Sequence, residues 1–166
     1  MLSKLRYISV ISLFSVIATT TMGQSSEEKA VTEVINRLFE GMTRSDSAMI
    51  RTTFAEGATL ATVYRDNTNS AVLKKEGSID GFLKAIAAPH TETYYEEIWN
   101  VKISMDGDFA HAWCDYAFYI GRKFNHCGVD SFHLYKSKDG WKIFHLADTR
   151  NKSGCNVPDA IQKKRQ

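Results

Sequence analysis

The sequence predicts an α+β fold in which three N-terminal helices pack on a curved antiparallel sheet. In three separate segments between residues 25 and 88, apolar side chains recur every three or four positions, as they do on one face of a helix. Between residues 94 and 149, four long strand-like runs alternate with tight turns, which is typical of an antiparallel meander. Helices followed by such a meander form one domain, with the helices on one face of the sheet.

The first helix begins at a capping box. Ser25 is followed three residues later by Glu28, so each side chain can bond the backbone N–H of the other residue. Apolar residues then follow the helical period and predict one buried stripe, made of Val31, Val34, Ile35, Leu38, Phe39 and Met42.

Two shorter helices and one strand come next. We expect the second helix, from residue 45, to end at Gly57, because glycine commonly follows a helix C-terminus. The first strand is predicted over residues 58–64, and the polar run at 66–70 is a loop by composition. A third helix is predicted between residues 78 and 88.

The meander is divided by dipeptides that favour tight turns. These are Asp106-Gly107, Gly121-Arg122 and Asp139-Gly140. The four strands between and around them are predicted at residues 94–105, 109–120, 124–135 and 141–149. Long strands that curl around a helix leave a cone, and its open end is a natural pocket.

The first 23 residues have the order of parts of a signal peptide. Lys4 and Arg6 form a positive start, residues 7–18 are mostly apolar, and small residues follow up to Gly23. This apolar run is short for a membrane-spanning helix. We therefore expect cleavage and export, to the periplasm or the medium, with membrane contact only through the uncleaved leader. The alternative is an uncleaved anchor.

The charge of the chain excludes one class of partner. Cleavage removes two of the 21 basic residues and none of the 19 acidic ones, which leaves a net charge of zero with neutral histidines. Nucleic-acid binding needs clustered basic residues. The cluster at residues 163–165 lies in a polar C-terminal tail, 157–166, which we interpret as a solvated end beyond a domain at 24–156. We expect no nucleic-acid partner.

Four runs of residues resemble a known superfamily. They are F-A-E-G-A at 54–58, H-C-G-V-D-S-F-H-L at 126–134, G-W-K-I at 140–143 and A-D-T-R at 147–150. They are similar to the SnoaL-like, "putative lumazine-binding" branch of the nuclear-transport-factor-2-like superfamily, over about residues 27–155. The resemblance implies a cystatin-like cone with a pocket, and pairing of two chains through the sheet.

The resemblance implies no single reaction, because one fold hosts many functions. The superfamily includes isomerases, dehydratases, cyclases, hydrolases and non-catalytic binders. Its ketosteroid-isomerase members use a tyrosine and two acids inside the cone. Tyr116, Asp115 and Asp130 are the right residue types, but their order does not match that set, so no catalytic assignment follows from it.

Asp130 is the first candidate site residue. It alternates with Phe132 and Leu134, so it should share their apolar face. A carboxylate there is either a structural hydrogen-bond acceptor or a working acid or base. The turn at residues 139–140 brings Asp148 and Arg150 within reach. The faces on which they lie depend on the loop length, and a simple salt bridge is the alternative.

Histidines supply the second kind of candidate. The turn at residues 121–122 places His111 near Asp130 and Asp115 near His126, as two acid–imidazole pairs suited to proton transfer. Asp130 and His111 are therefore the catalytic candidates. His126, Asp148, Arg150 and Tyr116 are the ligand-binding candidates. The five histidines show no H-x-H or H-x-x-x-H spacing, so we expect neither a metal nor another cofactor.

Three cysteines in an exported chain predict one disulfide and one free thiol. The last hairpin returns the chain to the level of Cys127 near residues 150–152, a few residues before Cys155. We expect these two to pair and Cys114, in mid-strand, to stay free and buried.

Three functions fit these observations. The first is an exported protein that binds a small, partly apolar organic ligand in the cone, without an assigned reaction. The second is a cofactor-free lyase or isomerase that uses Asp130 with a histidine. The third is an interaction protein. Aromatic residues such as Trp113 and Tyr116 lie on both faces of the predicted sheet. The helices can cover only one face, so the aromatic surface left exposed on the other face predicts a homodimer.

Overall fold

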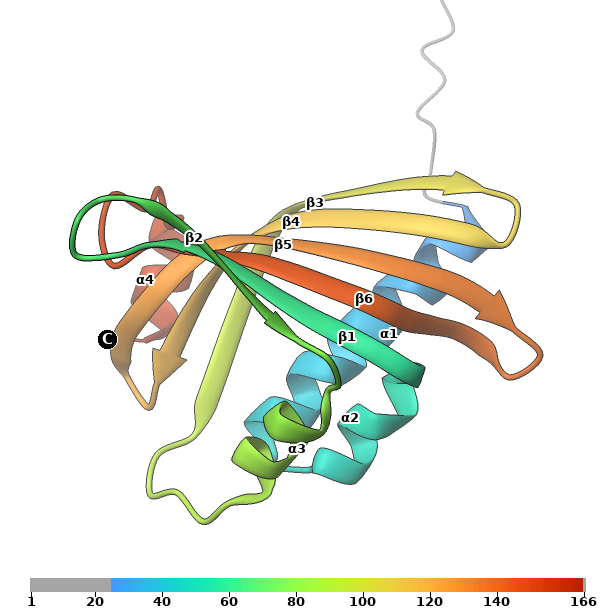
Figure 1. Ribbon diagram of the computed structural model, residues 1–166, viewed down its shortest axis with the longest axis horizontal. Coiled ribbons are helices and arrows are strands. Elements are labelled where there is room, and N and C mark those ends of the chain that lie inside the picture. The colour runs from blue at the N-terminus through green and yellow to red at the C-terminus, as the bar shows by residue number, and fades with distance from the viewer. Residues whose placement is uncertain (1–24, 166) are drawn as a thin grey trace, which may run out of the picture.

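The computed structural model describes residues 25–165, and the predicted signal peptide lies outside this range. The described residues form four helices and one six-stranded sheet, with the strands in the order β2-β1-β6-β5-β4-β3. Helices α1, α2 and α3 gather on one face of the sheet, which curves around them (Figure 1). The predicted α+β class is confirmed. No helix within residues 25–165 is long and apolar enough to cross a membrane.

Helix α1 spans Ser26–Thr43 and begins at the predicted capping box. Ser25 Oγ accepts from Glu28 N at 3.1 Å, and Glu28 Oε2 accepts from Ser25 N at 2.8 Å. The apolar stripe faces the sheet and is buried, with Val31, Ile35 and Leu38 at most 1% exposed.

The predicted end of the second helix at Gly57 is wrong. Helix α2 spans Ser47–Thr53, and strand β1 begins at once, over Phe54–Arg65. Gly57 lies inside β1 with φ of +70°, where the pairing of β1 with β6 shifts between Phe54 and Thr59. The glycine therefore permits an irregularity in a strand, not a helix end.

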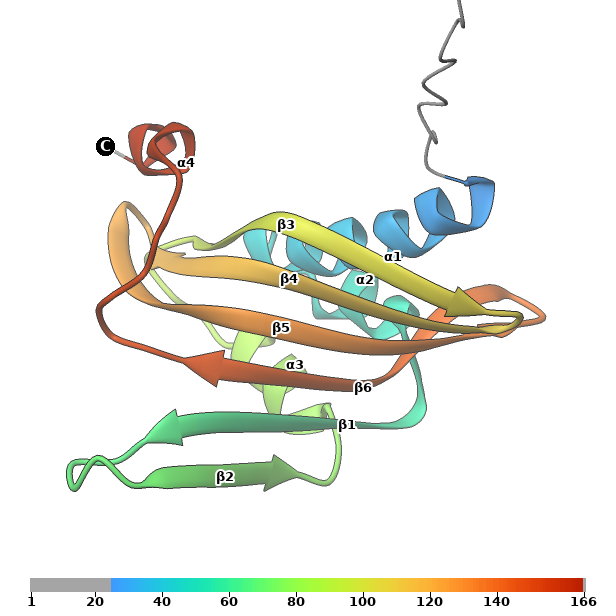
Figure 2. The same cartoon turned by 90° about the horizontal axis from the view of Figure 1, so that it is seen from above.

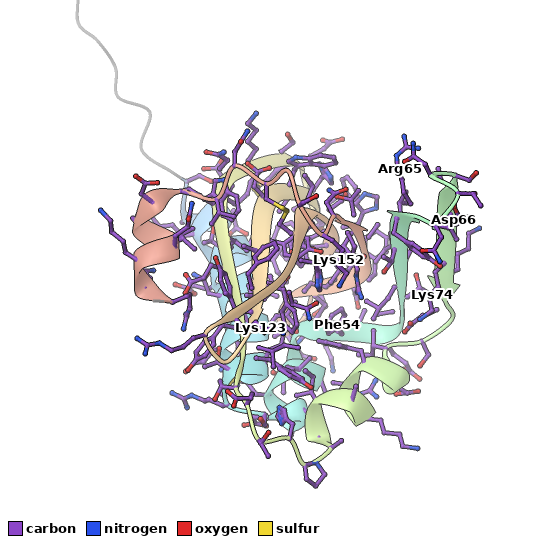
Figure 3. The ribbon with its side chains drawn as sticks, turned by 90° about the vertical axis from the view of Figure 1, so that its left-hand side faces the viewer. Phe54, Arg65, Asp66, Lys74, Lys123 and Lys152 are labelled. Atoms are coloured by element: carbon purple, nitrogen blue, oxygen red, sulfur yellow. A yellow bond between two sulfur atoms is a disulfide. The ribbon has the colours of Figure 1, made fainter. Side chains whose placement is uncertain are left out.

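Strand β2, over Ala71–Glu76, was not predicted. It pairs antiparallel with β1 across the expected loop, whose Asp66 carboxylate accepts from the backbone N–H of Thr68 and Ser70. Figure 3 shows the labelled Arg65, Asp66 and Lys74 side chains on this hairpin. Helix α3 spans Asp80–Ala87, as expected.

The meander has the predicted strands and turns. Its strands are β3 (Tyr94–Asp106), β4 (Phe109–Ile120), β5 (Lys123–Ser137) and β6 (Gly140–Arg150). They lie side by side in chain order, and β1 joins the far side of β6 in parallel (Figure 2). One face of the meander contributes Ala112, Phe132 and Ile143 to the core that the helices cover.

The C-terminal tail is not a solvated end. Helix α4, Asp159–Lys164, lies on the sheet face opposite α1–α3 and buries Ile161 against Ala117 and Tyr119. Arg165 pairs with Glu97 and its guanidinium lies 3.7 Å from the centre of the Tyr95 ring. An apolar side chain in a polar run, Ile161, holds this helix to the sheet.

The predicted disulfide is confirmed. Cys127 on β5 is bonded to Cys155, with their Cα atoms 6.2 Å apart, and Cys114 is free and fully buried. The disulfide ties the segment that leads to α4 to the first part of β5, an inner strand of the sheet.

Candidate functional site

A pocket of about 390 Å³ lies between the helices and the covered face of the sheet. A volume of this size accommodates a small organic molecule. Its walls are largely apolar and come from α1, α3 and all six strands; they include Leu38, Phe39, Phe82, Tyr94, Phe118 and Leu146. Polar side chains enter the pocket from the sheet.

Two carboxyl groups are hydrogen-bonded to each other in this pocket. Glu96 extends from β3 and Asp130 from β5. Asp130 is 3% exposed, and its Oδ2 has no hydrogen-bond partner within residues 25–165. Two carboxylates cannot bond each other without a proton, so at least one of the pair is protonated.

Burial explains this protonation. It raises the pKa of Glu96 to about 7, and the charge of Asp148 adds to the rise. Burial also raises the pKa of Asp130 well above its usual range, with further contributions from Glu96 and Asp148. A low-dielectric site disfavours the charged form of an acid, and a second carboxylate nearby disfavours it further.

A second group of polar residues lies beside this pair. Arg150 Nε donates to Asp148 Oδ2 at 2.7 Å, and Asp130 faces Asp148 directly across β5 and β6. The predicted proximity of these three residues is confirmed. Tyr116 is 1% exposed and donates its hydroxyl hydrogen to the backbone oxygen of Thr149 at 2.8 Å.

The Tyr116 contact depends on Gly128, which is its partner on β5. A Cβ atom at residue 128 would lie 1.9 Å from the Thr149 oxygen. The absence of a side chain at Gly128 therefore allows this carbonyl to approach and accept the tyrosine hydroxyl.

His126 is a neutral member of the pocket wall. Burial and the charge of Arg150 lower its pKa to about 4. Its Nδ1 lies 2.7 Å from Asn125 Oδ1, so Nδ1 carries the hydrogen and Nε2 retains a lone pair. The ring also packs edge-on against Tyr116, at 5.6 Å between centroids.

The predicted pairing of His111 with Asp130 is wrong. Asp130 lies opposite Cys114, whereas His111 lies opposite His133 and contacts Ser131 Oγ at 3.0 Å, on the other face of the sheet. Asn125 is an extra residue in β5, and one extra residue reverses which side chains share a face.

The predicted pair of Asp115 and His126 is also absent. Asp115 lies opposite Val129 and accepts from Asn100 Nδ2 at 2.7 Å. The structure thus brings Asp130, Asp148, Arg150, Tyr116 and His126 to one pocket and leaves His111 outside it. The chemical roles of these residues stay predictions.

Glu96 was missed by the sequence analysis, although a signal was present. It alternates with Tyr94 and Ile98 along β3, as Asp130 alternates with Phe132 and Leu134 along β5. Both acids therefore interrupt an apolar face. Over residues 25–165, no cluster of three His, Cys, Asp or Glu side chains has the arrangement of a metal site.

Solved structures show which proteins share this fold. A nuclear-transport-factor-2-like protein of unknown function from Shewanella baltica is 23% identical, with a TM-score of 0.57 over 79% of this chain and 100% of that one. A cystatin-like-fold protein from Nostoc punctiforme is 13% identical, with a TM-score of 0.61 over 82% and 100%.

A third solved structure with this fold is named as an enzyme. The protein from Novosphingobium aromaticivorans described as a "putative scytalone dehydratase" is 11% identical, with a TM-score of 0.60 over 79% of this chain and 90% of that one. No curated protein sequence matches the chain. At these identities the likeness shows the fold alone, and it confirms the predicted cystatin-like cone.

The family follows from the sequence match. Residues 26–146 match the model of the family described as "putative lumazine-binding", which covers more than half of the chain. The predicted family is thereby confirmed. The chain belongs to this "putative lumazine-binding" family.

Proposed function

We propose that this protein binds a small, partly apolar organic ligand in the pocket of the cone. The observation that carries the proposal is a buried, hydrogen-bonded pair of carboxyl groups, Glu96 and Asp130, inside an apolar cavity. Burial of two acids side by side costs free energy and contributes little to packing. Such a cost is typical of a site whose polar groups meet a ligand.

Native mass spectrometry of the protein purified from its own host tests this function. A small molecule that stays bound in the gas phase and leaves on denaturation is the expected result, because apolar walls enclose most of such a ligand. A homogeneous protein of the mature chain mass, at every concentration and with every gentle purification, would contradict it.

A second candidate is cofactor-free proton transfer, as in a lyase or isomerase. A carboxyl pair that shares a proton near neutral pH can accept a proton from an acidic C–H group at one oxygen and return one from the partner. Asp130 would act with Glu96, since His111 lies outside the pocket. Deuterium incorporation into the ligand that the wild-type protein retains, on incubation in D₂O, distinguishes turnover from binding.

Export to the periplasm or the medium is part of the proposal. The Cys127–Cys155 disulfide supports it, because disulfides persist in oxidising compartments. The order of parts in residues 1–23 supports it independently. N-terminal mass analysis of the exported protein should find Gln24 first, and intact Met1 in a membrane fraction would contradict cleavage.

We also propose a homodimer through the sheet face opposite α1–α3. Helix α4 covers one end of that face, over Tyr119. The other end exposes aromatic side chains from three strands, which are 36–45% exposed: Phe109, Trp113, Tyr135 and Phe144. An apolar patch of this kind is typical of a protein–protein interface.

A further inference from the structure

We propose that the ligand of the pocket is an organic amine, with an apolar body and a protonated nitrogen that lies against Glu96 and Asp130. This inference rests on the proposed function, since it requires that the pocket bind a small molecule. It names the chemical class that the polar end of the pocket selects.

The first argument for an amine is the excess of carboxyl groups over cations in the lining of the pocket. Its described lining holds four carboxyl groups, from Glu76, Glu96, Asp130 and Asp148, and one guanidinium, from Arg150. Arg150 is already bonded to Asp148. Glu76, on β2, is bonded to Lys74. The charge of Arg150 reaches Glu96 and Asp130 and lowers the pKa of both acids, but no cation in the described chain is bonded to either of them. Charge is weakly screened in these surroundings.

The second argument for an amine comes from three polar groups of the pocket, on Tyr116, His126 and Asp130, which can accept a hydrogen bond from a ligand. The Tyr116 hydroxyl hydrogen is committed to the Thr149 oxygen. His126 Nδ1 is committed to Asn125, which leaves Nε2 as an acceptor. Asp130 Oδ2, in a residue 3% exposed, has no hydrogen-bond partner in the described chain. A donor-rich ligand group, such as an ammonium, matches this set.

The third argument for an amine is the aromatic side chains in the wall of the pocket. Tyr94 and Phe118 pack with their ring planes tilted by 59° and their centroids 5.6 Å apart, and Phe118 also packs 5.1 Å from His126. Aromatic faces attract cations, and they attract them most where water is excluded. The same rings can pack against an apolar ligand body. One amine ligand can therefore place its charged nitrogen against the acids and its apolar body against the aromatic walls.

Binding of an ammonium should release a proton. The free pair holds a proton between Glu96 and Asp130, and an ammonium replaces that proton as the positive charge. The ligand keeps its three N–H bonds, and the proton leaves to solvent. The titratable or charged groups that face the pair are Asp148 and Arg150 on β6, Cys114 and Tyr116 on β4, and His126 on β5.

The affinity for an amine should therefore rise with pH. Glu96, with its pKa raised to about 7 by burial, favours the cation when ionised. Between roughly pH 6 and pH 8 such a group goes from about one-tenth to nine-tenths ionised, so we expect a rise of about tenfold. The amine itself stays protonated over this range.

Isothermal titration with matched probes tests the inference. The probes are 3-phenylpropylamine, 3-phenylpropanol and 3-phenylpropanoate. A second series carries the same three functional groups, amine, alcohol and acid, on a larger naphthalene-2-methyl body. The amine of at least one series should bind about tenfold or more tightly than its alcohol and its acid, which corresponds to about 1.4 kcal/mol. Titration in two buffers of different ionisation enthalpy should show proton release.

Variants that remove one carboxylate but keep the side-chain shape test whether the charge of the pocket determines amine binding. Glu96→Gln and Asp130→Asn should each reduce amine binding about tenfold and leave alcohol binding unchanged. Asp115→Asn makes the same change on the opposite face of the sheet and should bind as wild type. If Asp130→Asn does not fold, Glu96→Gln alone decides the matter.

The possible failures are distinguishable. Equal binding of amine and alcohol would overturn the amine inference and leave the proposed function standing. Preference for the acid would also overturn it, in favour of Arg150 as the anchor. If no probe of either size binds at millimolar concentration, the amine inference is overturned, and the native mass spectrum of the protein from its own host decides the proposed function separately.

Discussion

The carboxyl groups of Glu96 on β3 and Asp130 on β5 are hydrogen-bonded to each other in an apolar pocket. This relationship has a consequence for stability as well as for binding. An acid whose pKa is raised by folding favours the folded state at low pH, where it is protonated in both states, and loses that contribution as pH rises through the folded-state pKa.

Removal of Glu96 should therefore change how stability depends on pH. The pKa of Glu96 rises from 4.5 to about 7 on folding. Between roughly pH 4.5 and pH 8, the unfolding free energy of the wild type should fall relative to that of Glu96→Gln by about 3 kcal/mol. Urea denaturation at a series of pH values measures this. Glu33→Gln, on the exposed side of α1, is the matched control, and parallel curves for Glu96→Gln and wild type would refute the prediction.

Gly128→Ala should destabilise the fold. Its Cβ would lie 1.9 Å from the Thr149 oxygen that accepts the Tyr116 hydroxyl, so the carbonyl must move and the buried hydroxyl loses its acceptor. We expect a loss of about 2–4 kcal/mol in unfolding free energy. Gly77→Ala, where nothing lies within 4 Å, serves as the control and should change stability by less than about 0.5 kcal/mol. Equal effects at the two sites would show that the close approach is not real.

Loss of the disulfide should destabilise the protein and loosen α4. The bond closes a loop with a sequence separation of 28 residues. The double variant Cys127→Ser/Cys155→Ser should lose about 2–4 kcal/mol of unfolding free energy. Non-reducing peptide mapping should recover residues 127 and 155 in one linked pair.

Cys114 is the internal control for that mapping. It is fully buried, and burial raises the pKa of its thiol, so it should resist alkylation in the native protein. Alkylation of both Cys127 and Cys155 without reductant would contradict the pairing.

The proposed dimer predicts a charge-sensitive surface. Trp113→Glu places a carboxylate in the aromatic patch, on a side chain 45% exposed, and should convert a dimer into a monomer. Leu73→Glu makes a comparable change on β2, at a site 55% exposed and away from the patch, and should stay dimeric. Light scattering at micromolar concentration measures both. A monomeric wild type would refute the interface.

The fold was largely predictable because its signals are local. Turn dipeptides and strand alternation marked β3 to β6, and the capping box at Ser25 marked α1. Strand β2 gave no such signal, because an edge strand with one neighbour needs no apolar alternation, and Lys74 and Lys75 suit an edge. Helix α4 was missed because its stability comes from tertiary contacts of Ile161 and Arg165.

The site was predictable only in part, because face assignment depends on every residue between a turn and the site. The last hairpin placed Asp130 beside Asp148 correctly. The extra residue at Asn125 reversed the parity between β4 and β5, so His111 was assigned to the wrong face. Glu96 lies two strands from Asp130, and no short-range pattern in the sequence connects the two acids.

Ligand retention by matched variants tests the central claim, that the Glu96–Asp130 pocket binds a small molecule. Wild type, Asp130→Asn and Asp115→Asn would be purified identically from the native host and compared by native mass spectrometry. Arg150 pairs with Asp148 and not with Asp130, so Asp130→Asn should fold normally. We predict the same extra mass on wild type and Asp115→Asn, and its loss from Asp130→Asn. The same extra mass on all three proteins, or on none, would contradict the account.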